Sequence, residues 1–578
     1  MRATVLLLLG AMPPLPRASA EWGPKPRTLA ARDDAPSTSD FLRRPMAVAI
    51  VIGDYLYIDG GEVAQLYNGQ NSTGGLPSYA VNTTLSLPLA SSWTNATVVF
   101  TATPKPAPLL NSQAAWRAPS GNAFYVWGGV TPWFATPPPS SEIWKFTADG
   151  RGRGSWEREP PRDVVGMARN VRATDGAWTH GGGVGYWVGG VASAQTDTSV
   201  TGETRLAMTG VVAFDMTSGE VGNSSTEGMG RFGTLVGGGV QWTPFGNGGE
   251  GVLVFLGGRE SPVEAPGEGT GVGFGRVAVY EPKGQKWFYQ ATTGTRPTPR
   301  EKFCVVGVQG PNGTYEIFMY GGLLVAGGAS DEVYVLSLPG FVFFKAPPGP
   351  STKRSSNSCV VVGKRQLLSV GGGDGSLGFP DSLLDPDPWK NGLGVFDMTR
   401  MAWSDGYDAD AAAYESPAIV REWYSQGGLE SVTWSSPEVE RLFAAVSTPA
   451  PGDPDSPPPS GSGLGSPSPG SPSTPVGAIV GGVVAGVGGL ALVGLAFWLF
   501  FRRRAQGVSS PAELAPGEVK DAEKWEEPGF GIAPQELEAN FAASELPARH
   551  GLSEVGTSES HGRTELPGST ANWKQSAP

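Results

Sequence analysis

Histidine and cysteine are scarce in this chain, and their scarcity limits the metal chemistry open to it. The 578 residues include three histidines and two cysteines. Only His180 precedes residue 476, because His550 and His561 lie near the C-terminus. Copper and zinc sites draw on several imidazole or thiolate ligands, which this distribution does not supply. The sequence therefore predicts no metal site and no cofactor, and we expect His180, which precedes a run of glycines, to be structural.

Basic residues are outnumbered by acidic ones. The chain has 42 Lys and Arg against 54 Asp and Glu, which gives a formal net charge of −12. Because nucleic-acid binding depends on basic side chains that neutralise phosphates, we expect no nucleic-acid partner. The glycine runs at 181–183 and 237–239 lack the lysine of a phosphate-binding loop. A hydrolase that uses paired carboxylates stays open as an alternative, although the sequence singles out no pair.

Long hydrophobic runs occur in only two places. Residues 1–20 contain Arg2, an apolar run and the small residues Ala18-Ser19-Ala20, the pattern of a cleaved secretory signal peptide. Residues 476–501 carry no charge and are numerous enough to span a bilayer, and Arg502-Arg503-Arg504 follow directly. We therefore expect a single-pass type I protein of the plasma membrane, with its C-terminus in the cytoplasm.

The two hydrophobic runs divide the remaining chain into three parts. We expect an extracellular domain over 21–446, a Pro/Ser/Gly-rich stalk over 447–475 and a disordered cytoplasmic tail over 502–578. Two GxxxG motifs at 477–481 and 482–486 favour a homodimer through the transmembrane helix, although such motifs also arise by chance in glycine-rich spans. Repeated Glu-Leu motifs in the tail indicate docking sites for an unknown cytoplasmic partner; the alternative is compositional drift.

Glycine, by contrast, is abundant and regularly placed. Six Gly-Gly pairs recur at intervals of 50 to 68 residues, and each closes a short apolar run such as YLYID or VLVFL. One further strand is expected before each run and two after it, which makes four strands in each of six units. This pattern predicts an all-β fold, a six-bladed β-propeller. The pairs are Gly60-Gly61, Gly128-Gly129, Gly189-Gly190, Gly257-Gly258, Gly321-Gly322 and Gly371-Gly372.

Two residue types explain how such units would pack. Glycine reaches positive φ without a Cβ penalty, so each pair suits a sharp turn where neighbouring blades crowd. A large aromatic ring after the third strand would fill the space between adjacent sheets. Four units have a tryptophan in that place, the fifth has Phe343, and the third has no aromatic residue. The four are Trp93, Trp156, Trp287 and Trp403.

With these features the chain resembles the kelch-repeat β-propellers, and more narrowly the single-pass cell-surface kelch proteins of filamentous fungi. The resemblance covers about residues 41–446 and is carried by three stretches: FLRRPMAVAIVIGDYLYIDGGE (41–62), QAAWRAPSGNAFYVWGG (113–129) and VTWSSPEVERLF (432–443). Unit three departs from the family pattern. The family implies no settled activity. Its distant relative galactose oxidase is a copper radical oxidase, but the two histidines of that site have no counterpart here.

The two cysteines occupy matching positions in the sequence. Cys304 and Cys359 both lie in the strand that precedes the glycine pair, in units five and six. Adjacent blades place such strands side by side, so in a secreted protein we expect a disulfide between them. The alternative is two buried thiols that behave as small apolar residues.

Candidate ligand-binding residues come from arginines and loop tryptophans. One arginine precedes the first strand of each unit except the second, so a ring of arginines could line one mouth of the axial channel and bind an acidic ligand. The alternative is that each arginine bonds carbonyl groups of a neighbouring blade. Loop tryptophans could stack on sugar rings. The candidates are Arg44, Arg169, Arg231, Arg300, Arg354, Trp133 and Trp389.

The sequence also predicts glycosylation, a closing helix and a function. Five Asn-x-Ser/Thr sequons lie before the membrane segment, at Asn71, Asn82, Asn95, Asn223 and Asn312, and Asn82 falls within an expected strand.

Ser436-Pro437-Glu438 predicts a helix over about 437–446. Ring closure stays open, because residues 21–40 or 417–434 could add a strand to unit six. The combined pattern favours a non-enzymatic cell-surface sensor or adhesion protein that binds an extracellular glycan or protein. The alternative is a membrane-anchored carbohydrate-active enzyme.

Overall fold

The computed structural model describes residues 37–67, 69–70, 77–132, 135–350 and 352–444. The chain divides into two compact units, Met1–Gly463 and Leu464–Pro578, and all the described residues belong to the first. The predicted signal peptide, stalk, transmembrane segment and tail lie outside the described ranges. Within those ranges, no helix is long and apolar enough to cross a membrane.

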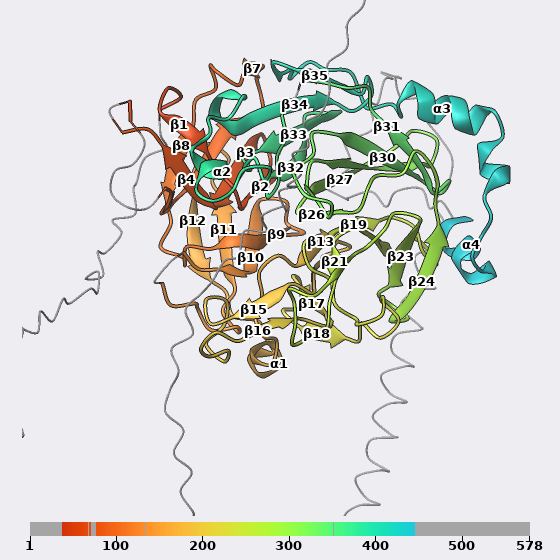
Figure 1. Ribbon diagram of the computed structural model, residues 1–578, viewed down its shortest axis with the longest axis horizontal. Coiled ribbons are helices and arrows are strands. Elements are labelled where there is room, and N and C mark those ends of the chain that lie inside the picture. Colours follow the sequence, from red (N-terminus) through yellow and green to blue (C-terminus); the bar gives the residue numbers. More distant parts are fainter. Residues whose placement is uncertain (1–36, 68, 71–76, 133–134, 351, 445–578) are drawn as a thin grey trace, which may run out of the picture. The chain divides into compact units, whose positions relative to one another are not determined.

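Antiparallel sheets dominate the described residues, as the sequence predicted (Figure 1). Six of these sheets contain four consecutive strands from one stretch of the chain, and we number them as blades 1 to 6. Blade 1 contains β2 (Ala47–Ile52), β3 (Tyr55–Gly60), β6 (Thr83–Pro88) and β8 (Thr101–Pro104), and blade 2 contains β9 (Asn111–Arg117), β10 (Ala123–Val130), β11 (Trp144–Ala148) and β12 (Gly154–Arg158). Blade 3 contains β13 (Ala177–Gly181), β14 (Val184–Val188), β17 (Val211–Asp215) and β18 (Val221–Ser224), and blade 4 contains β19 (Gly239–Thr243), β20 (Val252–Leu256), β23 (Arg276–Glu281) and β24 (Lys286–Ala291). Blade 5 contains β27 (Cys304–Gln309), β28 (Tyr315–Tyr320), β30 (Val333–Leu338) and β31 (Val342–Lys345), and blade 6 contains β32 (Ser358–Val362), β33 (Gln366–Val370), β34 (Leu393–Asp397) and β35 (Ala402–Ser404).

The six sheets close into a ring. The first strands of the blades contact one another in the order β2, β9, β13, β19, β27 and β32, and β32 contacts β2 again. This is the arrangement of a β-propeller, in which closure protects the sheet edges. Blade 6 takes no strand from residues 417–434, because Ala418–Ser425 form the helix α3. Residues 37–40 form turns, and Phe41–Arg43 (β1) pair instead with Glu62–Gln65 (β4).

The glycine pairs make the contacts between blades. All twelve glycines have positive φ, between 50° and 98°. The second glycine of each pair donates its N–H to a backbone carbonyl of the next blade, over 2.8 to 3.3 Å. The six bonds run from Gly61 to Leu110, Gly129 to Ala173, Gly190 to Leu235, Gly258 to Arg300, Gly322 to Arg354 and Gly372 to Arg44, so the last bond closes the ring.

A second ring of hydrogen bonds lies two residues further along the chain. One residue at or just before the start of each first strand, which we call the mouth residue, has positive φ: Met46, Ser112, Asp175, Gly237, Lys302 and Ser356. Five N–H groups donate to the carbonyl of the mouth residue in the preceding blade, over 2.7 to 2.9 Å. These bonds run from Met46 to Ser356, Ser112 to Met46, Gly237 to Asp175, Lys302 to Gly237 and Ser356 to Lys302.

The expected aromatic plugs are present in blades 2, 4, 5 and 6. Trp156, for example, packs edge-on against Phe124 at 5.6 Å between ring centres. In blade 1 the expected ring, Trp93, packs against side chains of blades 1 and 6 as predicted, although it is not part of the fourth strand, β8. Trp93 belongs instead to β7 (Trp93–Thr94), which pairs with β36 (Gly406–Tyr407) and packs Trp93 against Tyr407.

Residues 405–444, the C-terminal strap, run from blade 6 across the outer parts of blades 5 and 4. The strap contains β36, α3, a 3-10 turn η2 (Gly428–Ser431) and α4 (Pro437–Ala444), and both helices lie at the outer edge of the ring in Figure 1. Side chains of α4 are buried among those of blades 4 and 5. α4 lies where the Ser-Pro-Glu signal predicted a helix, and the Ser436 hydroxyl accepts the Val439 N–H at 3.3 Å.

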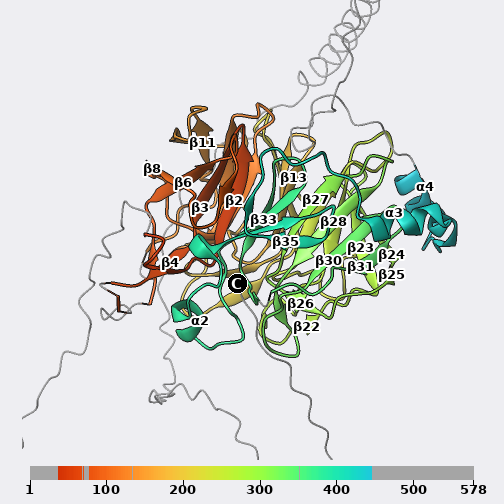
Figure 2. The ribbon, with the colours of Figure 1, turned by 90° about the horizontal axis from the view of Figure 1, so that it is seen from above.

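The connections that follow the glycine pairs are elaborated with short elements. In Figure 2, β4, α2, β26 and β22 lie on one side of the blades. Together these connections form the face that surrounds the mouth residues. The short elements of these connections are β4, β5 (Tyr79–Ala80), β15 (Val191–Ser193), β16 (Arg205–Ala207), β21 (Arg259–Glu260), β22 (Thr270–Gly271), β29 (Leu323–Leu324), α2 (Asp381–Leu384) and η1 (Lys390–Gly392). Three others lie between blades: α1 (Val164–Ala168), β25 (Thr293–Gly294) and β26 (Arg300–Glu301), and β26 pairs with β29.

Buried beneath the C-terminal strap is a carboxyl group, Glu316 of β28. It accepts hydrogen bonds from Ser337 at 3.1 Å and from Tyr414 and Ser416 of the strap at 3.2 Å each. Burial raises the pKa of Glu316 from its ordinary value of 4.5 to about 6. The strap therefore covers a group whose charge changes in the mildly acidic range.

We expect Gly371→Ala to destabilise the fold. A Cβ at this positive-φ position would collide with the backbone carbonyl oxygen of Arg44 in blade 1, so the junction that closes the ring would have to shift. The free energy of unfolding, measured in urea, should fall by more than 2 kcal/mol, against about 1 kcal/mol for left-handed strain alone. Gly53→Ala is the matched control, because Gly53 also has positive φ but no atom within 4 Å of its Cβ position. If both variants lost the same free energy of unfolding, close backbone contact at the junction between blades 6 and 1 would not be what makes Gly371 necessary.

The Glu316 carboxyl should make stability depend on pH. Because its pKa is higher in the folded chain, its contribution is complete below pH 4.5 and is lost as the pH rises through about 6. Glu316→Gln stays uncharged, so the stability of the wild type relative to this variant should fall by about 1 kcal/mol between pH 5 and pH 7.5. Urea unfolding at both pH values measures this difference, with the exposed Glu430→Gln as control. Parallel pH profiles for wild type and Glu316→Gln would disprove it.

Candidate functional site

The first strands of all six blades surround an axial cavity of about 550 Å³. Much of its wall is apolar, since Ala49, Val51, Ala115, Val305 and Val361 contribute to the lining. At the far end, where the first strands finish, the lining includes Asp54, Arg117, His180 and Lys364. A cavity with apolar walls and polar groups at its openings is the usual form of a ligand site in a rigid scaffold.

An ion pair crosses the mouth. The Lys302 ammonium lies 3.0 Å from the Asp175 carboxylate, although the two residues belong to blades 5 and 3. Blade 4 has Gly237 between them, and its lack of a side chain lets the pair meet above it. The Asp175 charge raises the pKa of Lys302. Because the two opposite charges neutralise each other, this pair is better suited to holding the mouth residues in place than to acting as the acid and base of a catalysed reaction.

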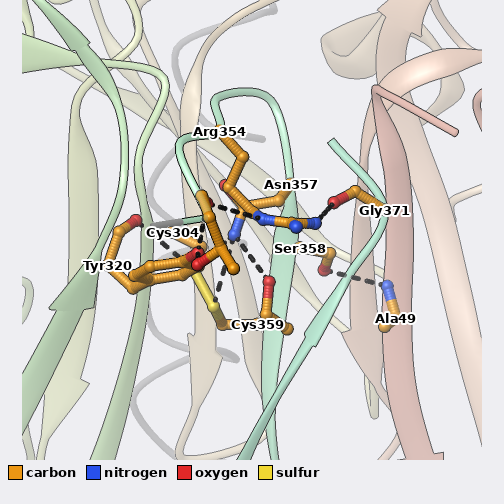
Figure 3. Close-up of a disulfide and its surroundings, with 10 residues drawn as sticks. Ala49, Cys304, Tyr320, Arg354, Asn357, Ser358, Cys359 and Gly371 are labelled. Atoms are coloured by element: carbon orange, nitrogen blue, oxygen red, sulfur yellow. Dashed lines mark hydrogen bonds between the residues drawn. A yellow bond between two sulfur atoms is a disulfide. The ribbon is translucent and has the colours of Figure 1, made fainter. Parts of the chain in front are cut away.

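The predicted disulfide is present in the wall of the cavity. Cys304 of β27 and Cys359 of β32 are joined, with Cα atoms 5.4 Å apart, and so connect blades 5 and 6 (Figure 3). The Asn357 amide donates to the Cys304 sulfur at 3.1 Å and to the Ser369 hydroxyl at 3.0 Å. On the other side, the Ser358 hydroxyl accepts the Ala49 N–H of blade 1.

The five candidate arginines do not form a ring. Arg44, Arg300 and Arg354 occupy equivalent positions, two residues before the mouth residue of their blade. Leucine or alanine takes the equivalent place in the other three blades, at Leu110, Ala173 and Leu235. Arg169 and Arg231 lie four residues too early, and both are exposed.

The three equivalent arginines are buried and bonded within the fold. Each is at most 4% exposed and donates to the carbonyl of the first glycine of its own blade, at Gly60, Gly321 or Gly371. Burial lowers the pKa of Arg44 to about 10, which leaves it charged at neutral pH. A buried guanidinium that already holds its partners offers no surface to a ligand, so the structure corrects the ligand-binding prediction for these three residues. The alternative prediction, that each arginine bonds carbonyl groups of a neighbouring blade, also differs from the structure, because each accepting glycine carbonyl belongs to the same blade as its arginine.

Trp389 also has a structural place. Its ring lies 4.6 Å from that of Trp403, and the Arg354 guanidinium stacks on it at 3.9 Å. The ring is half-buried between these two partners, which favours a packing role over an open platform for a sugar. Trp133 lies outside the described residues, so its role stays a prediction.

Sequence reasoning missed the buried charges that accompany these arginines. Asp387 is 2% exposed in its side chain and pairs with Arg354 at 3.0 Å and with Arg43 of blade 1 at 3.5 Å. Lys105 and Asp59 form a second buried pair at 2.6 Å. The one available signal was the Arg-Arg doublet at 43–44, of which only the second member was considered.

Of the five sequons, Asn71 lies outside the described residues. Asn223 and Asn312 are exposed, whereas Asn82 and Asn95 are half-buried. The Asn95 amide donates to the Leu393 carbonyl at 3.3 Å. Among the described residues there is also no group of three or more His, Cys, Asp or Glu placed to hold a metal ion.

Comparison with known proteins supports the repeat assignment. The chain matches no protein-family model. It is similar to a protein of Arthroderma benhamiae named Kelch repeat-containing protein; the two are 25% identical over 554 residues, which cover 83% of this chain and 77% of that protein. Together with the closed ring of sheets, this similarity confirms the resemblance to kelch-repeat propellers.

Replacing Arg354 should damage the fold, as expected of a structural residue. Arg354→Ala removes the nearest positive charge from the buried Asp387 carboxylate, which keeps the Trp389 N–H and its longer contact to Arg43, so the free energy of unfolding should fall by about 3 kcal/mol. The exposed Arg231→Ala should change it by less than about 0.5 kcal/mol. Chemical denaturation of both variants measures this contrast. If Arg354→Ala proved as stable as the wild type, the structural role of this arginine would be refuted.

Proposed function

We propose that this chain is a non-enzymatic binding protein that presents its propeller outside the cell to a protein ligand. The axial cavity carries the proposal: six blades fixed by two sets of backbone hydrogen bonds hold an open, preformed concavity at the centre of the ring. A rigid site loses little conformational entropy when it binds, which favours recognition. The kelch-repeat similarity supports a propeller that serves interaction.

The chemistry of the mouth favours binding over catalysis. Its two charged residues, Asp175 and Lys302, neutralise each other, and the wall beyond them is largely apolar. A protein ligand is favoured over a glycan because Trp389, the described tryptophan that was a candidate sugar platform, is packed against Trp403 and Arg354. Display at the plasma membrane through a stalk and a single helix, with glycosylation of the exposed sequons, belongs to the same proposal and rests on the sequence.

A retention assay tests the proposal. The full chain, immobilised in detergent, would be exposed to secreted proteins and to wall polysaccharides, and both the retained material and any change in the glycans would be recorded. We expect saturable retention of a protein without product. Ser112→Trp, which places a large ring at the mouth, should weaken retention at least tenfold.

Ser120→Trp is the matched control, because this exposed serine lies in the turn between β9 and β10, at the opposite end of the first strand. If only a polysaccharide were retained, the ligand would be a glycan and the proposal of a protein ligand would be wrong. Turnover of a glycan would refute the binding function and favour the carbohydrate-active enzyme.

A further inference from the structure

Three consecutive connections around the mouth expose large apolar side chains. They follow the glycine pairs of blades 4, 5 and 6 and comprise residues 259–275, 323–332 and 373–392. Nine large hydrophobic side chains are exposed among the described residues, and four of them lie in these connections. We call these four the apolar rim: Val263 is 41% exposed, Val325 57%, Leu377 40% and Phe379 70%.

The connections pack against one another, so the apolar rim belongs to a continuous surface. A Cβ at Gly271 of blade 4 would lie only 2.5 Å from Cγ2 of Val325 in blade 5, which shows how closely these two connections approach. The Ser376 hydroxyl of blade 6 accepts the Ala329 N–H of blade 5 at 2.9 Å. Figure 2 shows α2 and β22 of these connections on the same side of the ring as β26, which pairs with β29 of the second connection.

The exposed side chains stand on a fixed support. Leu383 of α2 is buried against Leu42 and Ala64 of blade 1. Asp385, four residues before Trp389, bonds Arg43 at 2.8 Å. The connection of blade 6 is therefore anchored at its base, while Leu377 and Phe379 project from it. Apolar side chains gathered on an anchored surface are typical of an interaction site, because their exposure to water is otherwise unfavourable.

Negative charge surrounds the apolar rim. The three connections contain nine Asp and Glu residues against two Lys and Arg residues. Three of the nine pair with basic residues outside the connections, namely Glu332, Asp385 and Asp387. Glu264, Glu268, Asp381 and Asp385 are exposed. A complementary partner therefore brings apolar side chains together with basic ones. Anionic lipid headgroups and nucleic acids are disfavoured, since both would be repelled by these carboxylates.

We propose that the apolar rim is a docking surface for a segment of another protein in which large apolar residues alternate with Lys or Arg. Phe379 and Leu377 supply the main apolar contacts, and the carboxylates of blades 4 and 6 pair with the basic residues of the segment. The inference rests on the proposed protein-binding function. It adds a second contact region beside the axial cavity, on the three blades whose connections contain the apolar rim.

A peptide library provides a direct test. Random twelve-residue peptides displayed on phage would be selected on the full chain in detergent, and the dissociation constant of the enriched peptide would be measured by fluorescence anisotropy. We expect a consensus with a net positive charge and at least one aromatic or large aliphatic residue. Phe379→Ser and Leu377→Ser should each weaken its binding at least tenfold. Asp381→Asn and Glu264→Gln should reduce its dependence on salt.

Matched controls and alternative outcomes make the test decisive. Ile419→Ser and Leu429→Ser remove side chains of similar exposure, 47% and 43%, from the C-terminal strap and should leave binding unchanged. An acidic or wholly apolar consensus, or a peptide indifferent to the rim variants, would overturn the proposal. Self-association abolished by Phe379→Ser would identify a second copy of this chain as the occupant and would also overturn it. If the rim variants have no effect while Ser112→Trp still weakens retention, the docking surface fails and the proposed function stands.

Discussion

The backbone hydrogen bonds between successive blades are the constraint on which the rest of this propeller depends. Each glycine pair turns at positive φ and offers one N–H to the next blade, and the sixth pair offers it to the first blade. Among the described residues, each blade takes its four strands from one stretch of the chain, and the sixth bond joins the last blade to the first. At four of the six junctions, a Cβ on the first glycine would collide with a backbone carbonyl oxygen of the next blade, which explains why glycine is needed there; the four are Gly60, Gly189, Gly321 and Gly371.

The sequence predicted the parts of the fold that depend on residue type. Glycine pairs identify the junctions, and apolar runs identify the strands that end at them. Two cysteines at matching positions identified the disulfide because the geometry of adjacent blades was already implied. The mouth residues could not be found in this way, because positive φ at Met46, Ser112 and Ser356 is imposed by the ring and has no consistent residue type.

The arginines were grouped wrongly for the same reason, because residue type does not reveal a position in the ring. Arg169 and Arg231 were grouped with three true equivalents because they precede a strand, whereas equivalence is set by distance from the mouth residue. The correct position contains arginine in blades 1, 5 and 6 and leucine or alanine in the others. A buried guanidinium at this position bonds a glycine carbonyl and needs a carboxylate nearby, as Asp387 shows for Arg354. Sequence spacing alone does not reveal such a partner, because Asp387 lies in a connection more than thirty residues away.

The arrangement separates stability from recognition. Backbone bonds, the disulfide and buried ion pairs fix the centre of the ring, and the bonded groups already have their partners within the fold. The connections after the glycine pairs are free to differ, since the junctions constrain only their ends. This freedom accounts for the contrast between the mouth, where Asp175 and Lys302 neutralise each other, and the connections of blades 4 to 6, where apolar side chains are left uncovered among carboxylates. Because the support beneath Phe379 is anchored to blade 1 through Leu383 and Asp385, changing the exposed residues should alter binding without loosening the ring.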